Sequence, residues 1–155
     1  MPTRTLLRSR QIRADLATLD TDRDEEKLLR GRYFEADCLA ADAVEDLVYI
    51  RANKSGGFFQ VEKVDIQAPA TMPAIGMILE KSTSTRCFVQ VFGIIELSGL
   101  VVGDRYWVGA DSQIAASPPT RVVGVQVIAQ VVGVALSGTE LLFNPDYQAV
   151  KLRAL

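Results

Sequence analysis

Hydrophobic and polar residues change their spacing about one fifth of the way along the chain, and this change divides it in two. In the first part Ile12, Leu16 and Leu19 recur at i, i+4 and i+7, which places them on one face of a helix. In the second part apolar residues alternate with polar ones or form short runs bounded by turn residues, as β-strands do. We therefore predict an N-terminal arm over residues 1–34 and a β domain over residues 35–155.

The clearest helix signal in the arm covers residues 22–30. A threonine and an aspartate at its start can accept hydrogen bonds from the free N–H groups of the first turn. Acidic residues then lie at the positive end of the helix dipole, and Gly31 is a natural stop. A helix this short is not stable alone in water, so its leucines need a surface to pack on. We predict that the arm anchors the protein through its apolar residues, which are Ile12, Leu16, Leu19, Leu28 and Leu29.

The β domain is predicted to contain about ten short strands at roughly even spacing. Residues 53–57 form a strong turn signal, because Asn and Gly tolerate positive φ. Residues 87–95 alternate as a strand that Gly93 interrupts, as a bulge or kink. Residues 122–136 form one long valine-rich run. No helical pattern alternates with the strands, which favours an antiparallel β-barrel or sandwich over a parallel α/β sheet.

Composition excludes several classes of function. The 155 residues carry a net charge of −2, which predicts no strong attraction to nucleic acid or to an anionic membrane. No apolar run approaches the roughly 20 residues of a membrane-spanning helix. Histidine is absent, which removes the Ser-His-Asp and Cys-His nucleophilic sites and the common zinc sites. Carboxylate and lysine chemistry remain open.

Two patterns that suggest a bound ligand are better explained as turns. Gly99, Gly103 and Gly109 do not have the spacing of a dinucleotide or P-loop fingerprint. Asp104 and Asp111 lack the alternating oxygen ligands and the terminal glutamate of an EF-hand loop. We therefore expect no cofactor, no metal and no catalytic residue, and we predict that the protein is not an enzyme.

Two pairs of residues leave alternatives open. Cys38 and Cys87 each lie in an apolar strand-like run, so they are either buried free thiols or one disulfide. Tyr106 and Trp107 are adjacent in a predicted strand and therefore face opposite sides. We predict that one of these aromatic side chains lies in the core and the other at an interface, where aromatic residues are enriched.

A resemblance to a known group of proteins appears in residues 99–145. The pattern Gly-Leu-x-x-Gly-x-x-Tyr-x-Val is followed by a turn and later by Gln-Val-Val-Gly-Val-Ala-Leu-Ser-x-Thr-x-Leu-x-Phe. This pattern resembles β-rich structural proteins of tailed bacteriophages, such as head decoration proteins and the terminal domains of head or tail fibres. The resemblance extends over most of residues 35–145 and brings no catalytic residues with it.

The resemblance implies a surface-exposed homotrimer on a virion assembled in the host cytoplasm. Its partners would be the major capsid protein or other virion proteins, and the chain is too short for a long fibre with a shaft. We therefore expect a compact capsid decoration protein or a short fibre held by its arm. The alternative is a receptor- or glycan-binding knob of a tail fibre that uses loops 53–57, 81–85 and 111–120. A polysaccharide depolymerase is a third hypothesis, for which the sequence offers no constellation of residues.

Overall fold

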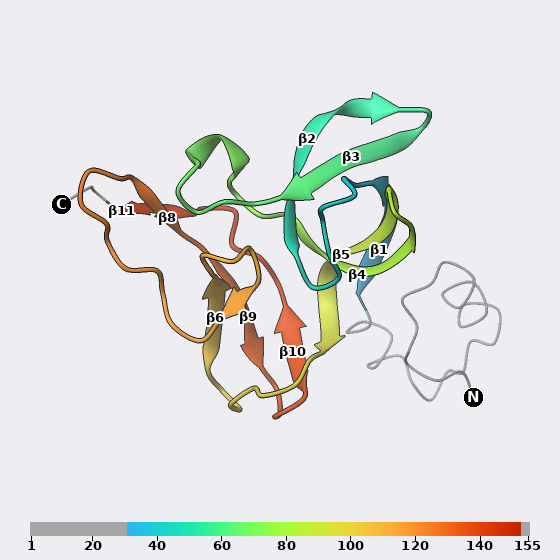
Figure 1. The fold of residues 1–155 in the computed structure, drawn as a ribbon. Coiled ribbons are helices and arrows are strands. Elements are labelled where there is room, and N and C mark those ends of the chain that lie inside the picture. The colour runs from blue at the N-terminus through green and yellow to red at the C-terminus, as the bar shows by residue number, and fades with distance from the viewer. Residues whose placement is uncertain (1–30, 153–155) are drawn as a thin grey trace.

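The computed structural model describes residues 31–152, which form eleven strands and one short 3-10 helix (Figure 1). The predicted mainly β fold is confirmed. The predicted helix near 22–30 lies outside the described residues, and the first strand begins within the last residues assigned to the arm. In chain order the elements are β1 (Arg32–Asp37), β2 (Leu47–Ser55), β3 (Phe58–Lys63), η2 (Pro69–Thr71), β4 (Gly76–Thr83), β5 (Arg86–Glu96), β6 (Arg105–Val108), β7 (Ile114–Ala115), β8 (Val127–Ala129), β9 (Val131–Ala135), β10 (Glu140–Phe143) and β11 (Val150–Leu152).

Five strands close into a small barrel. Their order is β1–β3–β2–β4–β5, and β5 pairs back onto β1 to complete the circuit. The predicted antiparallel pairing holds except between β1 and β3, which run parallel. Closure leaves these strands few free edges, which protects a small β domain from edge-to-edge association.

The interior of the barrel is filled by one side of each strand. Cys87, Val89 and Val91 of β5 all point into it, so the predicted alternation of this strand is confirmed. Burial of each fully buried aliphatic side chain stabilises the folded state by about 1.5–3 kcal/mol. The cluster of buried residues, which we call the barrel core, consists of Ala36, Cys38, Val48, Val61, Ile78, Cys87 and Val89, with Phe34, Ile75 and Val91 packed against it.

Strand β5 belongs to two sheets and changes partner at Gly93. Up to Phe92 it pairs with β1, and from Gly93 onward it pairs with β10. Gly93 has a φ of 114°, a conformation that glycine adopts at no steric cost, which agrees with the predicted kink. The strand is not interrupted there, because β5 continues through Gly93 to Glu96. Beyond it the sheet continues through β10, β9, β6 and β7, which we call the second sheet.

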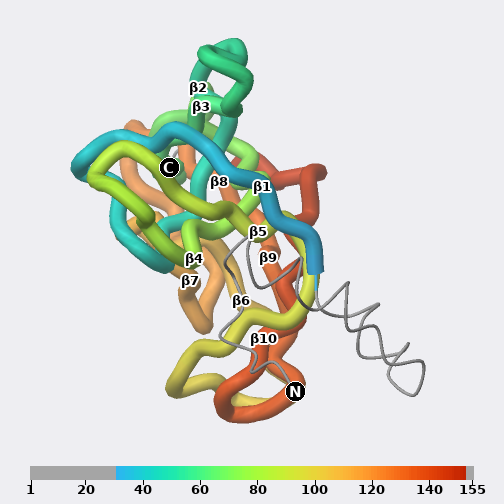
Figure 2. Tube along the Cα trace, turned by 90° about the vertical axis from the view of Figure 1, so that its right-hand side faces the viewer, coloured from blue at the N-terminus to red at the C-terminus, as the bar shows by residue number. Residues whose placement is uncertain are grey.

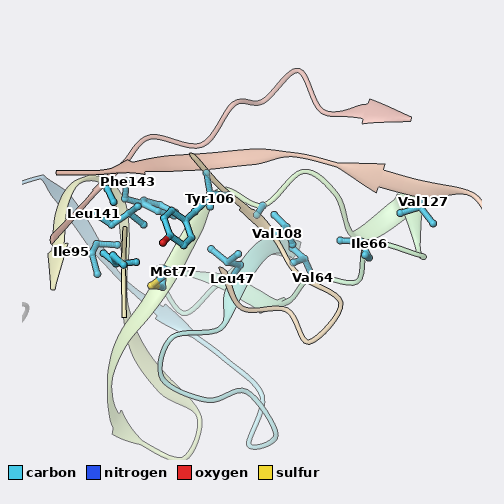
Figure 3. Close-up of a cluster of buried hydrophobic side chains, with 14 residues drawn as sticks. Leu47, Val64, Ile66, Met77, Ile95, Tyr106, Val108, Val127, Leu141 and Phe143 are labelled. Carbon is cyan, nitrogen blue, oxygen red and sulfur yellow. The ribbon is translucent and has the colours of Figure 1, made fainter. Parts of the chain in front are cut away.

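A second core fills the space between the outer wall of the barrel and the second sheet (Figure 3). Leu47 of β2 and Met77 of β4 point outward from the barrel into this space, and Leu141 and Phe143 of β10 meet them from the other side. All four side chains are fully buried. Of the two predicted alternatives, the fold is the barrel, with extra strands packed against its outer wall.

The valine-rich run over residues 122–136 does not form one continuous strand. Val122 and Val125 form an isolated bridge around a turn, and Gln130 separates β8 from β9. The reason is a change of partner: β8 pairs with β11, whereas β9 pairs with β6 and β10. Apolar periodicity records burial but not the identity of the neighbouring strand, so it cannot mark this break.

The turn over residues 38–46 is held by buried charges. Asp42 Oδ2 accepts a hydrogen bond from the Leu39 N–H at 2.7 Å, and Asp46 Oδ2 accepts one from Ala43 at 2.8 Å. The ammonium of Lys81 donates to the carbonyl oxygen of Asp42 at 2.6 Å. Side-chain hydrogen bonds of this kind fix turns, so these aspartates have structural partners.

The hairpin of β2 and β3 stands out from the body of the molecule in both views (Figures 1 and 2). β2 pairs with β4 only at Leu47 and Val48, and beyond these residues β3 is its sole partner among the described strands. Residues 50–57 are all exposed. The hairpin is therefore the most prominent projection of the described domain.

Candidate interaction surface

Tyr106 and Trp107 point to opposite sides of the second sheet, as predicted. Tyr106 is 4% exposed in the second core, and its hydroxyl accepts a hydrogen bond from the Val101 N–H at 2.9 Å. Trp107 is half-buried and belongs to neither core. The single tryptophan of the chain therefore lies on the outer face of the sheet.

The outer face of the second sheet carries a row of apolar side chains. Strand register places Ile94 of β5 opposite Leu142 of β10, and Leu142 opposite Val134 of β9. Arg105 of β6 is opposite Val134 and ends the row. Ile94 and Leu142 are half-buried, and Val134 is 36% exposed. We call Ile94, Leu142, Val134 and Trp107 the outer apolar face.

The sheet is apolar on its inner side as well. Ile95, Leu141 and Ala135, the chain neighbours of the row, are at most 2% exposed in the second core. An antiparallel sheet with one face in water normally carries polar residues on that face. The outer apolar face departs from this pattern, which makes it a candidate contact surface.

Carboxylates border one end of the outer apolar face. Glu96 of β5 and Glu140 of β10 lie directly opposite each other. Together with Glu45 they line a shallow hollow of about 650 Å³. In the described part of the chain, no three potential metal-ligating side chains come together. The hollow is an acidic rim of the surface.

The two cysteines are free thiols inside the barrel. Cys38 is 3% and Cys87 0% exposed. Burial raises the pKa of the Cys87 thiol, and the neighbouring Cys38 thiol raises it further. The thiolate is the nucleophilic form of cysteine, so the barrel interior is a packed core and not a reactive site.

A second surface combines aromatic rings and cations on the projecting hairpin. Lys54 Nζ lies 4.2 Å from the centre of the Phe59 ring, and Phe59 meets the Phe34 ring at a centroid distance of 5.0 Å. The Arg86 guanidinium lies 3.6 Å from the centre of the Phe58 ring. Such contacts stabilise exposed sites by about 0.5–1 kcal/mol, and here they hold the hairpin against the barrel wall.

The turn interpretation of the glycine-rich stretch is confirmed. Gly99 and Gly103 have φ values of 73° and 84°, a conformation that few other residues adopt. Asp111 Oδ1 accepts a hydrogen bond from the Gln113 N–H at 3.1 Å, as a turn aspartate does. The predicted anchoring residues of the arm lie outside the described residues, and they are Ile12, Leu16, Leu19, Leu28 and Leu29.

Most of the outer apolar face was not predicted from the sequence. Alternation predicted an interface position for one of Tyr106 and Trp107, but it did not predict Ile94, Leu142 or Val134. The missed signal is a pair of apolar doublets within the predicted strands, Ile94–Ile95 and Leu141–Leu142. Because adjacent strand residues face opposite sides, each doublet must place one apolar side chain on each face.

No protein-family model, curated protein or solved structure matches the chain. Across residues 31–152, the structure contains no helix with the length and apolar character needed to span a bilayer. The assignment of a function therefore depends on the surfaces described above and on the sequence resemblance.

Proposed function

We propose that this protein is a structural component of a tailed-bacteriophage virion, a surface-exposed homotrimer that decorates or stabilises the capsid or forms a short fibre. The observation that carries the proposal is the outer apolar face. A sheet with apolar side chains on both faces gains stability when a partner covers the second face. Such a surface supports contact and not catalysis, and the sequence resemblance supplies the kind of assembly.

The neighbouring copy covers the β9–β6 end of the face in this proposal. Val134 and Trp107 lie there, and tryptophan is enriched in the buried centre of protein interfaces. Arg105 borders the same end and provides a charged rim. A contact of this kind repeated around a threefold axis closes a ring, and the arms attach that ring to the major capsid protein.

Val134→Asp tests the contact between copies. Val134 is partly exposed, so the variant should fold with little change in melting temperature. An aspartate buried unpaired in the interface should weaken trimer formation by at least about tenfold, which corresponds to about 1.4 kcal/mol. Sedimentation equilibrium of the wild-type protein and the Val134→Asp variant measures this change. Val123→Asp is the control, because Val123 is 75% exposed on a separate loop.

Two results would contradict the proposed contact. One is a wild-type protein that stays monomeric at every concentration, and the other is a Val134→Asp variant that assembles as well as Val123→Asp. Copy number per particle then separates the forms of the proposal, since hundreds of copies indicate decoration and a handful indicates a fibre.

Removal of residues 1–30 should leave the β domain folded but unable to bind particles, and binding by that truncation would refute the role of the arm.

The second candidate function is the receptor- or glycan-binding knob. The observation that favours it is the projecting hairpin, where Lys54 and Phe59 offer a positive charge and a flat apolar ring together. The two candidates differ in what they bind. A knob should bind host cells or isolated surface glycans without any particle protein present, whereas a decoration protein should bind only capsids.

A further inference from the structure

We propose that Leu28 and Leu29 cover the β5–β10 end of the outer apolar face of their own chain. The inference deepens the proposed function, and it rests on that function only for the neighbouring copy at the opposite end. The surface is Ile94 and Leu142, and the occupant is the leucine pair that precedes β1 in the sequence.

The point where the described chain begins is the first support. β1 starts beside the second half of β5 in both views (Figures 1 and 2). A β-carbon placed on Gly31 would overlap the carbonyl oxygen of Phe92, so the chain passes against the β5 backbone there. β1 pairs with β5 only as far as Phe92, and residues 93–96 pair with β10 alone among the described strands. The described chain therefore begins at the edge of the outer apolar face.

The reach of the chain is the second support. Leu29 is two residues from Gly31, and an extended chain spans at most about 7 Å over two residues. Ile94 is two residues along β5 from Phe92, about 7 Å, and Leu142 is one strand further, about 5 Å. An extended chain therefore brings Leu29 as far as Ile94, and Leu142 lies one strand spacing beyond, within contact of side chains at that point. Val134 lies one more strand away, which leaves it to the neighbouring copy.

Chemical complementarity is the third support. The leucine pair is flanked by Lys27 and Arg30, so an apolar centre lies between two cations. Ile94 and Leu142 form an apolar centre bordered by the facing carboxylates of Glu96 and Glu140. The charges that flank the leucine pair are therefore opposite in sign to those that border this surface.

The short tether favours the chain's own face over that of a neighbour. A segment linked through one or two residues has a very high effective concentration at the adjacent surface. A neighbouring copy presents the same surface only at the concentration of the assembly. The arm is thereby divided: Leu28 and Leu29 hold its base, and Ile12, Leu16 and Leu19 remain for anchoring.

A reporter thiol in the full-length chain tests the inference. Leu142→Cys places a single reactive group on the face, since Cys38 and Cys87 are buried. In this background Leu28→Ser with Leu29→Ser should raise the rate of reaction with a water-soluble maleimide at least tenfold, at every protein concentration. The matched control replaces Leu6 and Leu7, which also precede an arginine but are far from Gly31 in sequence, and it should leave the rate unchanged.

A Val123→Cys reporter controls for general loosening of the structure, because the strand that follows its loop, β8, lies across the molecule from the start of β1 (Figure 1). An equal rate increase at Val123→Cys would overturn the inference, as would a Leu142→Cys rate that ignores the leucine substitutions. If the thiol introduced by Leu142→Cys is protected from the maleimide in both arm variants, and dilution removes this protection, a second copy of the chain covers this end. That outcome overturns the inference and leaves the proposed trimer intact. Conversely, a monomeric wild-type protein whose leucine pair protects position 142 would support the inference and refute the proposed trimer.

Discussion

Gln130 connects the second sheet to the loop before β4 through a buried amide clamp. Its Oε1 accepts a hydrogen bond from the Ala74 N–H at 2.8 Å, and its Nε2 donates to the Ala74 carbonyl oxygen at 2.9 Å. Gln130 is 1% and Ala74 0% exposed. The side chain therefore supplies the two hydrogen bonds that a neighbouring strand would otherwise give this residue.

Gln130→Leu removes both bonds while keeping a side chain of similar size. Each buried backbone group left without a partner costs about 1–3 kcal/mol, so the two together cost roughly 2–6 kcal/mol. The burial of the leucine itself offsets part of this, and we expect a net loss of roughly 2–4 kcal/mol. That is a large share of the roughly 5–15 kcal/mol by which domains are stable.

Urea unfolding followed by circular dichroism measures the loss. With a slope of about 2 kcal/mol per molar urea, the midpoint should fall by roughly 1–2 M. Gln126→Leu is the control, because Gln126 is exposed in the same segment and should move the midpoint little. A fall of less than about 0.5 M in Gln130→Leu would refute the reasoning, since it would mean that the clamp contributes no more than an ordinary surface contact.

Two further predictions concern Cys87 and Lys81. Burial, and to a smaller extent the neighbouring Cys38 thiol, raises the pKa of Cys87 above its ordinary 9.0. The folded state therefore keeps a proton that the unfolded state loses in alkaline solution. The contribution of this group to the free energy of unfolding should be fully present below about pH 9 and should fall above it by up to about 1.4 kcal/mol per pH unit. Urea unfolding between about pH 8 and 10.5 measures the slope, and Cys87→Ala should reduce it; an identical slope would contradict the assignment. Lys81→Met removes a cation that donates to the Asp42 carbonyl oxygen at 2.6 Å, so we expect a loss of about 1–3 kcal/mol and faster amide exchange in residues 38–46. Lys63→Met, at an exposed side chain, should show neither effect, and equal behaviour of the two variants would count against the role of Lys81.

Local sequence patterns were sufficient to find most strands, because strong turn residues bound them. The kink at Gly93 and the inward side of β5 were predicted correctly for this reason. Barrel closure was not specified by any local pattern. It depends on β1 pairing with two strands at once, for example Ala36 with both Phe59 and Cys87, which are distant in sequence.

The candidate surface was less predictable than the fold. Alternation placed Tyr106 and Trp107 on opposite sides but did not show what lies beyond Trp107. The doublets Ile94–Ile95 and Leu141–Leu142 require an apolar side chain on each face, yet register alone shows that their outward members form one row. The role of the arm's apolar residues stays a prediction.

The described chain begins beside β5, the longest strand of the described domain. Beyond Phe92 β1 no longer pairs with β5, and the buried Gln90 side chain donates to the carbonyl oxygens of Phe92 and Ile94 at 3.0 and 3.3 Å. Gly31 lies against this same point. If the arm is the anchor, as we propose, force on the arm is transmitted to β5, the strand that pairs in both sheets. An attachment at the β2–β3 hairpin would transmit that force to the barrel alone, whereas an attachment at Gly31 transmits it to the barrel and the second sheet together.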